Sequence, residues 1–443
     1  MPWKRKKATH RANPEKRRSS RYDAANIGPS TVATLNTSPH LTRQHWAVLA
    51  FAWAVWFSGF FSLTLLTFLL QPVQDAFGPS ERGLAWLTGI AIGMTGVGGF
   101  VFGALADRLG RKTSSAIAVV TFCAGNLLTA LAPSFAFFAF ARGLAGLGIG
   151  GTWGAGQALL GETFPPDRRG RFGAIAQTGS ALGLGAAAAV GSFLAPSLGW
   201  RLVFALGALP LLLLPLLRVV PESDVWQARR DQERAGNTPA AGIARTLLAP
   251  PIVGTFASAL LLTLLNMSNY WFTVSWLPRY LQKERGLDLA RSGLATLAFV
   301  LGSFLGYVSF GWVSDRIGRR VAFTLYCALM AAGLVMFTVF FPLIAARPQL
   351  VLVFLFVAGL GTGTWSGYGP MLSELFPTAV RGTAMSVIMN LTRGIQFLAP
   401  VVIAAVAPRW GMAGGIALAA GFAALAGAWV WVLPETRGRR IEA

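Results

Sequence analysis

Long apolar runs without a single charge constrain this chain more than any other feature. Residues 84–106 contain no Asp, Glu, Lys or Arg, and neither do residues 172–200. About 20 helical residues cross the ~30 Å hydrocarbon core of a bilayer, so each run can span a membrane. Only 12% of the chain is charged, about half the share of an average soluble protein. These features exclude a soluble enzyme, and also an outer-membrane barrel, whose strands alternate over ~10 residues.

Twelve apolar segments follow one another, six on each side of a polar stretch. They lie near residues 46–70, 84–106, 114–132, 135–161, 172–195, 202–220, 252–277, 292–313, 321–344, 350–373, 384–407 and 413–433. The pattern predicts an all-α membrane protein with twelve transmembrane helices. The predicted divisions are a basic tail (1–44), a six-helix bundle (45–220), a central loop (221–251), a second six-helix bundle (252–433) and a C-terminal tail (434–443).

Lys and Arg are distributed unevenly between the connecting segments. If the N-terminus is cytoplasmic, the inner segments hold 28 of the 38 basic residues and the outer loops hold 8. Positive residues are enriched on the cytoplasmic side of membrane proteins. We therefore expect a multi-pass protein of the cell membrane with both termini and the central loop inside. The basic tail is expected to be a disordered cytoplasmic segment rather than a nucleic-acid site.

An internal repeat relates the two halves. The pattern Gly-x-x-x-Asp-Arg-x-Gly-Arg-Lys/Arg occurs at residues 103–112 and again at 311–320, displaced by 208 residues. Three further blocks match at nearly the same offset: 151–153 with 363–365, 162–170 with 374–382, and 221–223 with 434–436. The repeat predicts two six-helix bundles of common ancestry, related by pseudo-symmetry.

These blocks resemble the signatures of the major facilitator superfamily of secondary transporters over about residues 45–438. The duplicated Asp-Arg-x-Gly-Arg pattern is the most specific of them. The Glu-x-x-Pro-x-x-x-Arg-Gly blocks, Arg142-Gly143 and the Pro-Glu-Ser/Thr endings resemble the branch of sugar porters and metabolite–proton symporters. The resemblance implies the major facilitator fold and alternating-access transport of a small polar solute. We expect a monomer without a cofactor.

Catalytic and metal-binding patterns are missing from the sequence. Cys123 and Cys327 lie inside apolar runs, and the three histidines lie near the N-terminus, so no cluster has metal-ligand spacing. We therefore expect no metal site, no catalytic residue and no enzyme. Transport of an organic acid is the preferred hypothesis. The alternatives are a neutral sugar or polyol carrier, a drug antiporter or a non-transporting membrane sensor; the fifth span lacks the Gly-Pro dipeptide of many drug antiporters.

The resemblance also assigns gating roles to charged residues at the cytoplasmic ends of spans. Asp107 and Arg111 are expected to form an ion-pair latch between the halves when the protein faces outward. Glu162 with Arg169, and Glu374 with Arg381, are expected to be gate pairs. The full set is Asp107, Arg108, Arg111, Glu162 and Arg169 in the first half, Asp315, Arg316, Arg319, Glu374 and Arg381 in the second, and Arg142 within the fourth span.

Arg393 is the principal candidate for substrate binding, because a charge deep in a span is costly and usually functional. It lies about 13 Å into the eleventh span, near the midplane where such transporters bind substrate. A guanidinium can bind a carboxylate through two hydrogen bonds. The alternative is a structural arginine paired with another helix. Further candidates are Asn390 and Gln396 on the same span, Gln157 on the fourth, Asn266, Asn269, Tyr270 and Thr273 on the seventh, and Trp365 and Tyr368 on the tenth.

The sequence offers no titratable group for proton coupling inside the membrane. Related symporters carry Asp-Gly-Phe-Asp in the first span, where this chain has Ser58-Gly59-Phe60-Phe61. None of the 17 acidic residues lies at mid-depth in a span. We therefore expect uniport, or an acid substrate that carries its own proton.

Overall fold

The computed structural model describes residues 41–165, 169–234, 249–344 and 347–436, which are almost entirely helical. No β-strand occurs in these ranges, so the all-α prediction is confirmed. The helices of the first half are α2 (Arg43–Phe68), α3 (Leu70–Phe77), α4 (Glu81–Leu109), α5 (Arg111–Ala130), α6 (Phe135–Thr163), α7 (Arg169–Ala189), η2 (Val190–Leu194), α8 (Ala195–Leu206), η3 (Leu209–Arg218) and α9 (Asp224–Arg234).

The second half continues with the same succession of long helices. They are α11 (Pro250–Val274), α12 (Leu277–Lys283), α13 (Leu289–Ile317), α14 (Arg319–Thr338), α15 (Phe341–Ile344), α16 (Pro348–Gly361), α17 (Thr364–Leu375), α18 (Thr378–Ile395), α19 (Leu398–Trp429) and η4 (Val430–Val432). The predicted tails lie largely outside the described residues.

Ten helical stretches of the described chain are long and apolar enough to cross a membrane, rather than twelve. Two of them, residues 171–218 and 380–432, are 48 and 53 residues long. Each reverses at a glycine with positive φ, Gly199 (76°) or Gly411 (67°), a conformation that other residues rarely adopt. A single glycine turns the chain without a longer loop, so each stretch holds two spans. The total of twelve spans agrees with the sequence prediction.

The internal repeat is reproduced in helix lengths and caps. Helices α4 and α13 have 29 residues each, and α5 and α14 have 20 each. Ser80 accepts a hydrogen bond from the backbone N–H of Gly83 at the start of α4 (3.2 Å), and Asp288 caps α13 in the same way (2.7 Å). A side-chain cap satisfies a backbone donor that the helix itself leaves unpaired. The predicted pseudo-symmetry therefore extends beyond the matched sequence blocks.

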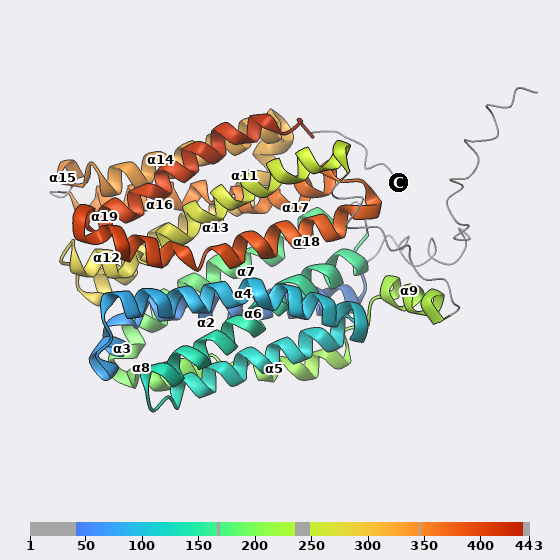
Figure 1. Cartoon of the computed structure of the whole chain (residues 1–443), viewed down its shortest axis with the longest axis horizontal. Coiled ribbons are helices and arrows are strands. Elements are labelled where there is room, and N and C mark those ends of the chain that lie inside the picture. The colour runs from blue at the N-terminus through green and yellow to red at the C-terminus, as the bar shows by residue number, and fades with distance from the viewer. Residues whose placement is uncertain (1–40, 166–168, 235–248, 345–346, 437–443) are drawn as a thin grey trace, which may run out of the picture. The chain divides into compact units, whose positions relative to one another are not determined.

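The two halves meet along a few helices. Figure 1 shows α2, α4, α5, α6 and α8 on one side and α11, α14, α16, α17, α18 and α19 on the other. Helix α4 packs against α18, and α7 packs against α13. At Gly96 of α4 a Cβ atom would overlap the backbone of Gly394 on α18, so the helices approach at backbone distance there. This contact between halves holds the candidate site.

Candidate substrate site and gates

Arg393 lies near the end of α18, and only 7% of it is exposed. Its guanidinium carbon is 4.9 Å from the ring centre of Trp153 on α6 and 5.7 Å from that of Trp56 on α2. Tryptophan faces attract cations more strongly than other aromatic side chains do. Among the described residues, no acidic side chain pairs with Arg393 and no hydrogen bond from its guanidinium is found. The cation is therefore held by aromatic faces of the other half.

A run of aromatic rings extends from this arginine across the contact between the halves. Trp56 lies 4.8 Å from Phe60, whose ring centre is 6.5 Å from that of Tyr270 on α11. Tyr270 lies 6.1 Å from Trp365, which is 5.2 Å from Tyr368 on the same helix, α17. Tyr270, Trp365 and Tyr368 were all expected at the site from sequence. The structure brings them together in one aromatic wall.

The polar residues of the seventh span are buried and bonded mainly to one another. Asn269 donates to the Oδ1 atom of Asn266 (3.1 Å), which also accepts from Thr364 of α17 (3.2 Å). Thr273 donates to the carbonyl of Asn269 within its own helix (2.8 Å). The Nδ2 atom of Asn266 is buried without a partner among the described residues. Asn266 is therefore the residue of this predicted polar face whose side-chain N–H group remains available as a donor.

Asn390 and Gln396 face different neighbours although both lie three residues from Arg393. Gln396 donates to Ser268 of α11 (3.2 Å), whereas Asn390 packs on Gly99 of α4 and lines a groove there. Each step of three residues rotates a helix position by about 60°, so these two side chains diverge by about 120°. Gln157 is half-buried one turn beyond Trp153 on α6. The structure therefore does not gather all the expected polar residues around Arg393.

Trp365 was predicted from sequence as a site residue, whereas its repeat counterpart, Trp153, was not. The repeat pairs the Gly-Thr-Trp blocks at 151–153 and 363–365, and this symmetry was a signal for Trp153. The side of the first span that Trp56 and Phe60 face had no comparable signal, because that span is apolar on all sides.

Arg142 on α6 is fully buried inside the first half. Its guanidinium donates to the Oδ1 atom of Asn126 (2.9 Å) and to the backbone carbonyl of Ser62 (3.0 Å). The ring of Phe204 lies 5.3 Å away. All of these partners belong to the first half, so this arginine is bound within one bundle.

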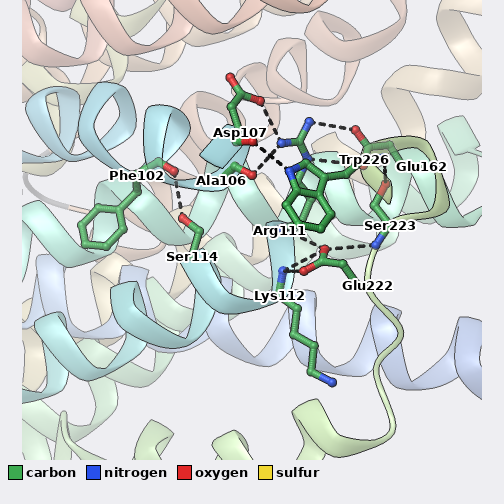
Figure 2. Close-up of polar contacts among 10 residues, drawn as sticks. All are labelled: Phe102, Ala106, Asp107, Arg111, Lys112, Ser114, Glu162, Glu222, Ser223 and Trp226. Atoms are coloured by element: carbon green, nitrogen blue, oxygen red, sulfur yellow. Dashed lines mark hydrogen bonds and ion pairs between the residues drawn. The ribbon is translucent and has the colours of Figure 1, made fainter. Parts of the chain in front are cut away.

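The signature segment of the first half forms a polar cluster around Arg111 (Figure 2). Arg111 pairs with Asp107 at 2.8 Å and with Glu162 at 3.3 Å. The carboxylate of Glu222 accepts a hydrogen bond from the backbone N–H of Arg111 (2.8 Å), and the indole of Trp226 donates to the carbonyl of Asp107 (2.8 Å). The expected Asp107–Arg111 pair is present, but every partner lies in the first half. Its role as a latch between the halves stays a prediction.

The second half repeats this cluster. Arg319 pairs with Asp315 at 2.8 Å and with Glu374 at 3.4 Å, and its backbone N–H donates to Glu435 at 3.0 Å. The predicted pairing of Glu374 with Arg381 is wrong for this conformation, because Arg381 donates to the carbonyl of Phe376 instead (3.2 Å). Arg108 and Arg316 are exposed, and the side chain of Arg169 lies outside what the structure describes. Glu162 and Glu374 thus each bind the signature arginine of their own half.

At the opposite end of the bundle, an ion-pair cluster joins the two halves. Arg279 of α12, only 3% exposed, binds Glu81 of α4 through two hydrogen bonds (2.6 and 3.0 Å) and also donates to Gln74 (2.6 Å). Lys283 binds the same carboxylate at 2.5 Å. Of the ion pairs between described residues, only these two cross between halves. Glu81 and Arg279 are 198 residues apart, so sequence alone gave no sign of the pairing.

The known proteins that this chain resembles are membrane transporters. Residues 51–299 and 259–442 match the Major Facilitator Superfamily. A "Probable 4-methylmuconolactone transporter" of Cupriavidus pinatubonensis is 30% identical over 91% of this chain and 93% of its own length. A cis,cis-muconate transport protein of Acinetobacter baylyi is 27% identical over 77% of this chain and 82% of its own length.

Solved structures give the same architecture. The inward-open xylose transporter XylE of E. coli superimposes with a TM-score of 0.72 at 20% identity, covering 90% of this chain and 98% of that chain. This likeness concerns the fold. Together with the duplicated signature clusters and the matched residues, it leads to one conclusion: the chain belongs to the Major Facilitator Superfamily and is a multi-pass membrane transporter.

Proposed function

We propose that this transporter carries a small unsaturated organic acid, and that Arg393 binds the carboxylate of that acid. The observation that carries the proposal is a buried guanidinium that lies between the halves on tryptophan faces, with no acidic partner among the described residues. A charge in that position costs about 3 kcal/mol or more. A bound carboxylate offsets this cost through charge-assisted hydrogen bonds.

The aromatic wall favours a flat, conjugated substrate. Phe60, Tyr270 and Trp365 present ring faces and edges with centres 6.1 to 6.5 Å apart. Aromatic groups attract other π systems in stacked or edge-on contact. The two relatives named above are called transporters of muconate and of a muconolactone, and such molecules combine a carboxylate with conjugated double bonds. Both features match the pair of Arg393 and its aromatic surroundings.

The experiment compares Arg393→Ala and Arg393→Lys with the parent protein in proteoliposomes, using cis,cis-muconate and benzoate as substrates and xylose as a neutral probe. Loss of bonds between charged groups, each worth about 1.5–3 kcal/mol, predicts at least a tenfold rise in KM for the acids with Lys and near-complete loss of uptake with Ala. Arg291→Ala, on an exposed arginine, is the matched control and should leave acid uptake unchanged. The proposal is contradicted if Arg393→Ala keeps the acid affinity of the parent protein. It is also contradicted if the parent protein takes up xylose but neither acid.

We further propose that the protein works as a monomer, with both termini and the central loop cytoplasmic. The distribution of basic residues supports this orientation, and a reporter fused to the C-terminus is expected inside. Glu81 then lies at the outer end of α4, so its ion pairs close the outer side of this conformation. No acidic residue lies at mid-depth in a span. Any transported proton would therefore be carried by the substrate and not by a carboxylate of the protein.

The outer closure has its own test. In Glu81→Gln the carboxylate that both Arg279 and Lys283 bind is lost, so the halves should separate more often at that end. A Ser268→Cys reporter, buried in this conformation, should then react faster with an impermeant maleimide added outside. Asp288→Asn removes an exposed pair within one half and should not change the rate. Equal rates in all three backgrounds would refute the closure.

A further inference from the structure

The guanidinium of Arg393 belongs to the second half, but both of its aromatic contacts belong to the first. Trp56 and Trp153 lie 6.1 Å apart at an interplanar angle of 46°, and the cation lies over both rings. A flat guanidinium that lies over ring faces keeps its N–H groups available at its edges. The two tryptophans thus hold the charge while leaving its hydrogen-bond donors free.

A second donor lies beside the first. The Nε1 atom of Trp56 is buried without a partner among the described residues, and only 6% of Trp56 is exposed. Buried indole N–H groups usually have an acceptor, because leaving one unpaired costs free energy. Arg393 likewise has no acceptor in the described chain. Two neighbouring side chains with unused donors point to an acceptor-rich group, which is what a carboxylate provides.

The internal repeat supplies a natural comparison for Trp153. Its counterpart Trp365 lies against Tyr270 and Tyr368, with ring centres 6.1 and 5.2 Å away. No cation–ring contact of Trp365 is found among the described residues. The two tryptophans at equivalent positions therefore have different neighbours: Trp153 lies against Arg393 and Trp56, whereas Trp365 lies against two tyrosines.

We propose that Trp56 and Trp153 are positioning residues for substrate binding: they hold the Arg393 guanidinium across the contact between the halves, and the Trp56 indole N–H donates a second hydrogen bond to the substrate carboxylate. This inference rests on the proposed function and deepens it. Because Arg393 lies in the second half and the two tryptophans lie in the first, a carboxylate bound there contacts both halves. The site then selects carboxylates by two donors whose positions depend on each other.

A double-mutant cycle tests the coupling, with benzoate and cis,cis-muconate as probes and Arg393→Lys as the second mutation. A lysine ammonium lacks the planar face that stacks on tryptophan. Trp153→Leu alone should raise KM for the acids about tenfold with kcat nearly unchanged. In the Arg393→Lys background, Trp153→Leu should raise KM by less than about twofold, because the effects of residues that act as a unit are not additive.

Matched variants separate positioning from packing. Trp365→Leu removes a tryptophan of the same repeat, and its effect should be additive with Arg393→Lys. Trp153→Phe keeps an aromatic face and should recover most of the affinity, and it carries the test if Trp153→Leu fails to fold. Trp56→Phe keeps the ring but removes the N–H group, and should raise KM about fivefold.

The outcomes are distinct. Additive effects of Trp153→Leu and Arg393→Lys, or a cycle identical to that of Trp365→Leu, would overturn the positioning role. An unchanged KM in Trp56→Phe would overturn the second hydrogen bond. If instead Arg393→Ala keeps full acid affinity, the proposed function itself fails, whatever the tryptophan variants do. If Arg393→Ala loses the acids while Trp153→Leu does not, only the present inference fails.

Discussion

Each half of this transporter contains a buried arginine that has no acidic partner among the described residues, and these two arginines are held in different ways. Arg142 in the first half donates to Asn126 and to the carbonyl of Ser62. Arg393 in the second half lies on two tryptophan rings and has no acceptor among the described residues. At the repeat offset of 212 residues, each arginine corresponds to an apolar residue of the other half, Phe354 or Ala181. The pseudo-symmetric scaffold is therefore broken at both positions.

Under the proposed function, the difference separates a structural charge from one that is available to a ligand. A buried charge requires partners, and two of the three guanidinium nitrogens of Arg142 find neutral acceptors inside its own bundle. The rings around Arg393 attract its charge but accept none of its N–H groups in the plane of the guanidinium. Burial alone therefore does not distinguish the two arginines. What distinguishes them is whether hydrogen-bond acceptors surround the guanidinium.

The largest effect is expected from Arg142→Met. This change removes charge-assisted bonds at 2.9 and 3.0 Å and leaves buried acceptors with fewer donors. The expected loss of stability is about 3 kcal/mol. Thermal unfolding of the purified protein in detergent should show a lower midpoint, and uptake of every substrate should fall in proportion to the folded fraction. A normal midpoint would mean that Arg142 is not a structural residue.

A change of the opposite sign is expected from Arg393→Met. The substitution replaces a buried cation that lacks an acid partner by an apolar side chain, which removes the cost of burying the charge. The substrate-free protein should therefore unfold at the same or a higher temperature, while acids no longer raise the midpoint. If Arg393→Met lowers the midpoint as much as Arg142→Met does, the two arginines are alike and the comparison is wrong.

The smallest effect is expected from Ser62→Ala, which probes the edge of the Arg142 cluster. The Ser62 hydroxyl donates to Asn126 at 2.7 Å and accepts a long hydrogen bond from Arg142 at 3.5 Å. Losing one good neutral bond costs about 1 kcal/mol. The backbone carbonyl that binds Arg142 remains, so acid KM should not change. A large rise in KM would show that the Arg142 cluster communicates with the substrate site. Thermal unfolding and uptake kinetics measured on the same preparation provide both values.

Much of the fold follows from local properties of the sequence. Uncharged apolar runs long enough for a bilayer determine the helices, because a backbone in hydrocarbon must satisfy its own hydrogen bonds. The 208-residue offset determines the pseudo-symmetry, and it holds for helix lengths and for the caps Ser80 and Asp288. The sequence placed span boundaries around Gly199 and Gly411, but not the positive φ by which a single residue makes each turn.

The amino-acid sequence by itself determined the twelve spans, the repeat and the signature pairs. Tertiary structure alone decided which side chains meet: Arg393 with Trp153, Glu81 with Arg279, and Glu374 with Arg319 rather than Arg381. The physical reason is the range of the interactions. Hydrophobicity and helix capping act within one segment. The Glu374–Arg319 contact joins residues 55 apart, and the other two contacts join residues 198 or more apart, so all three depend on how the helices pack.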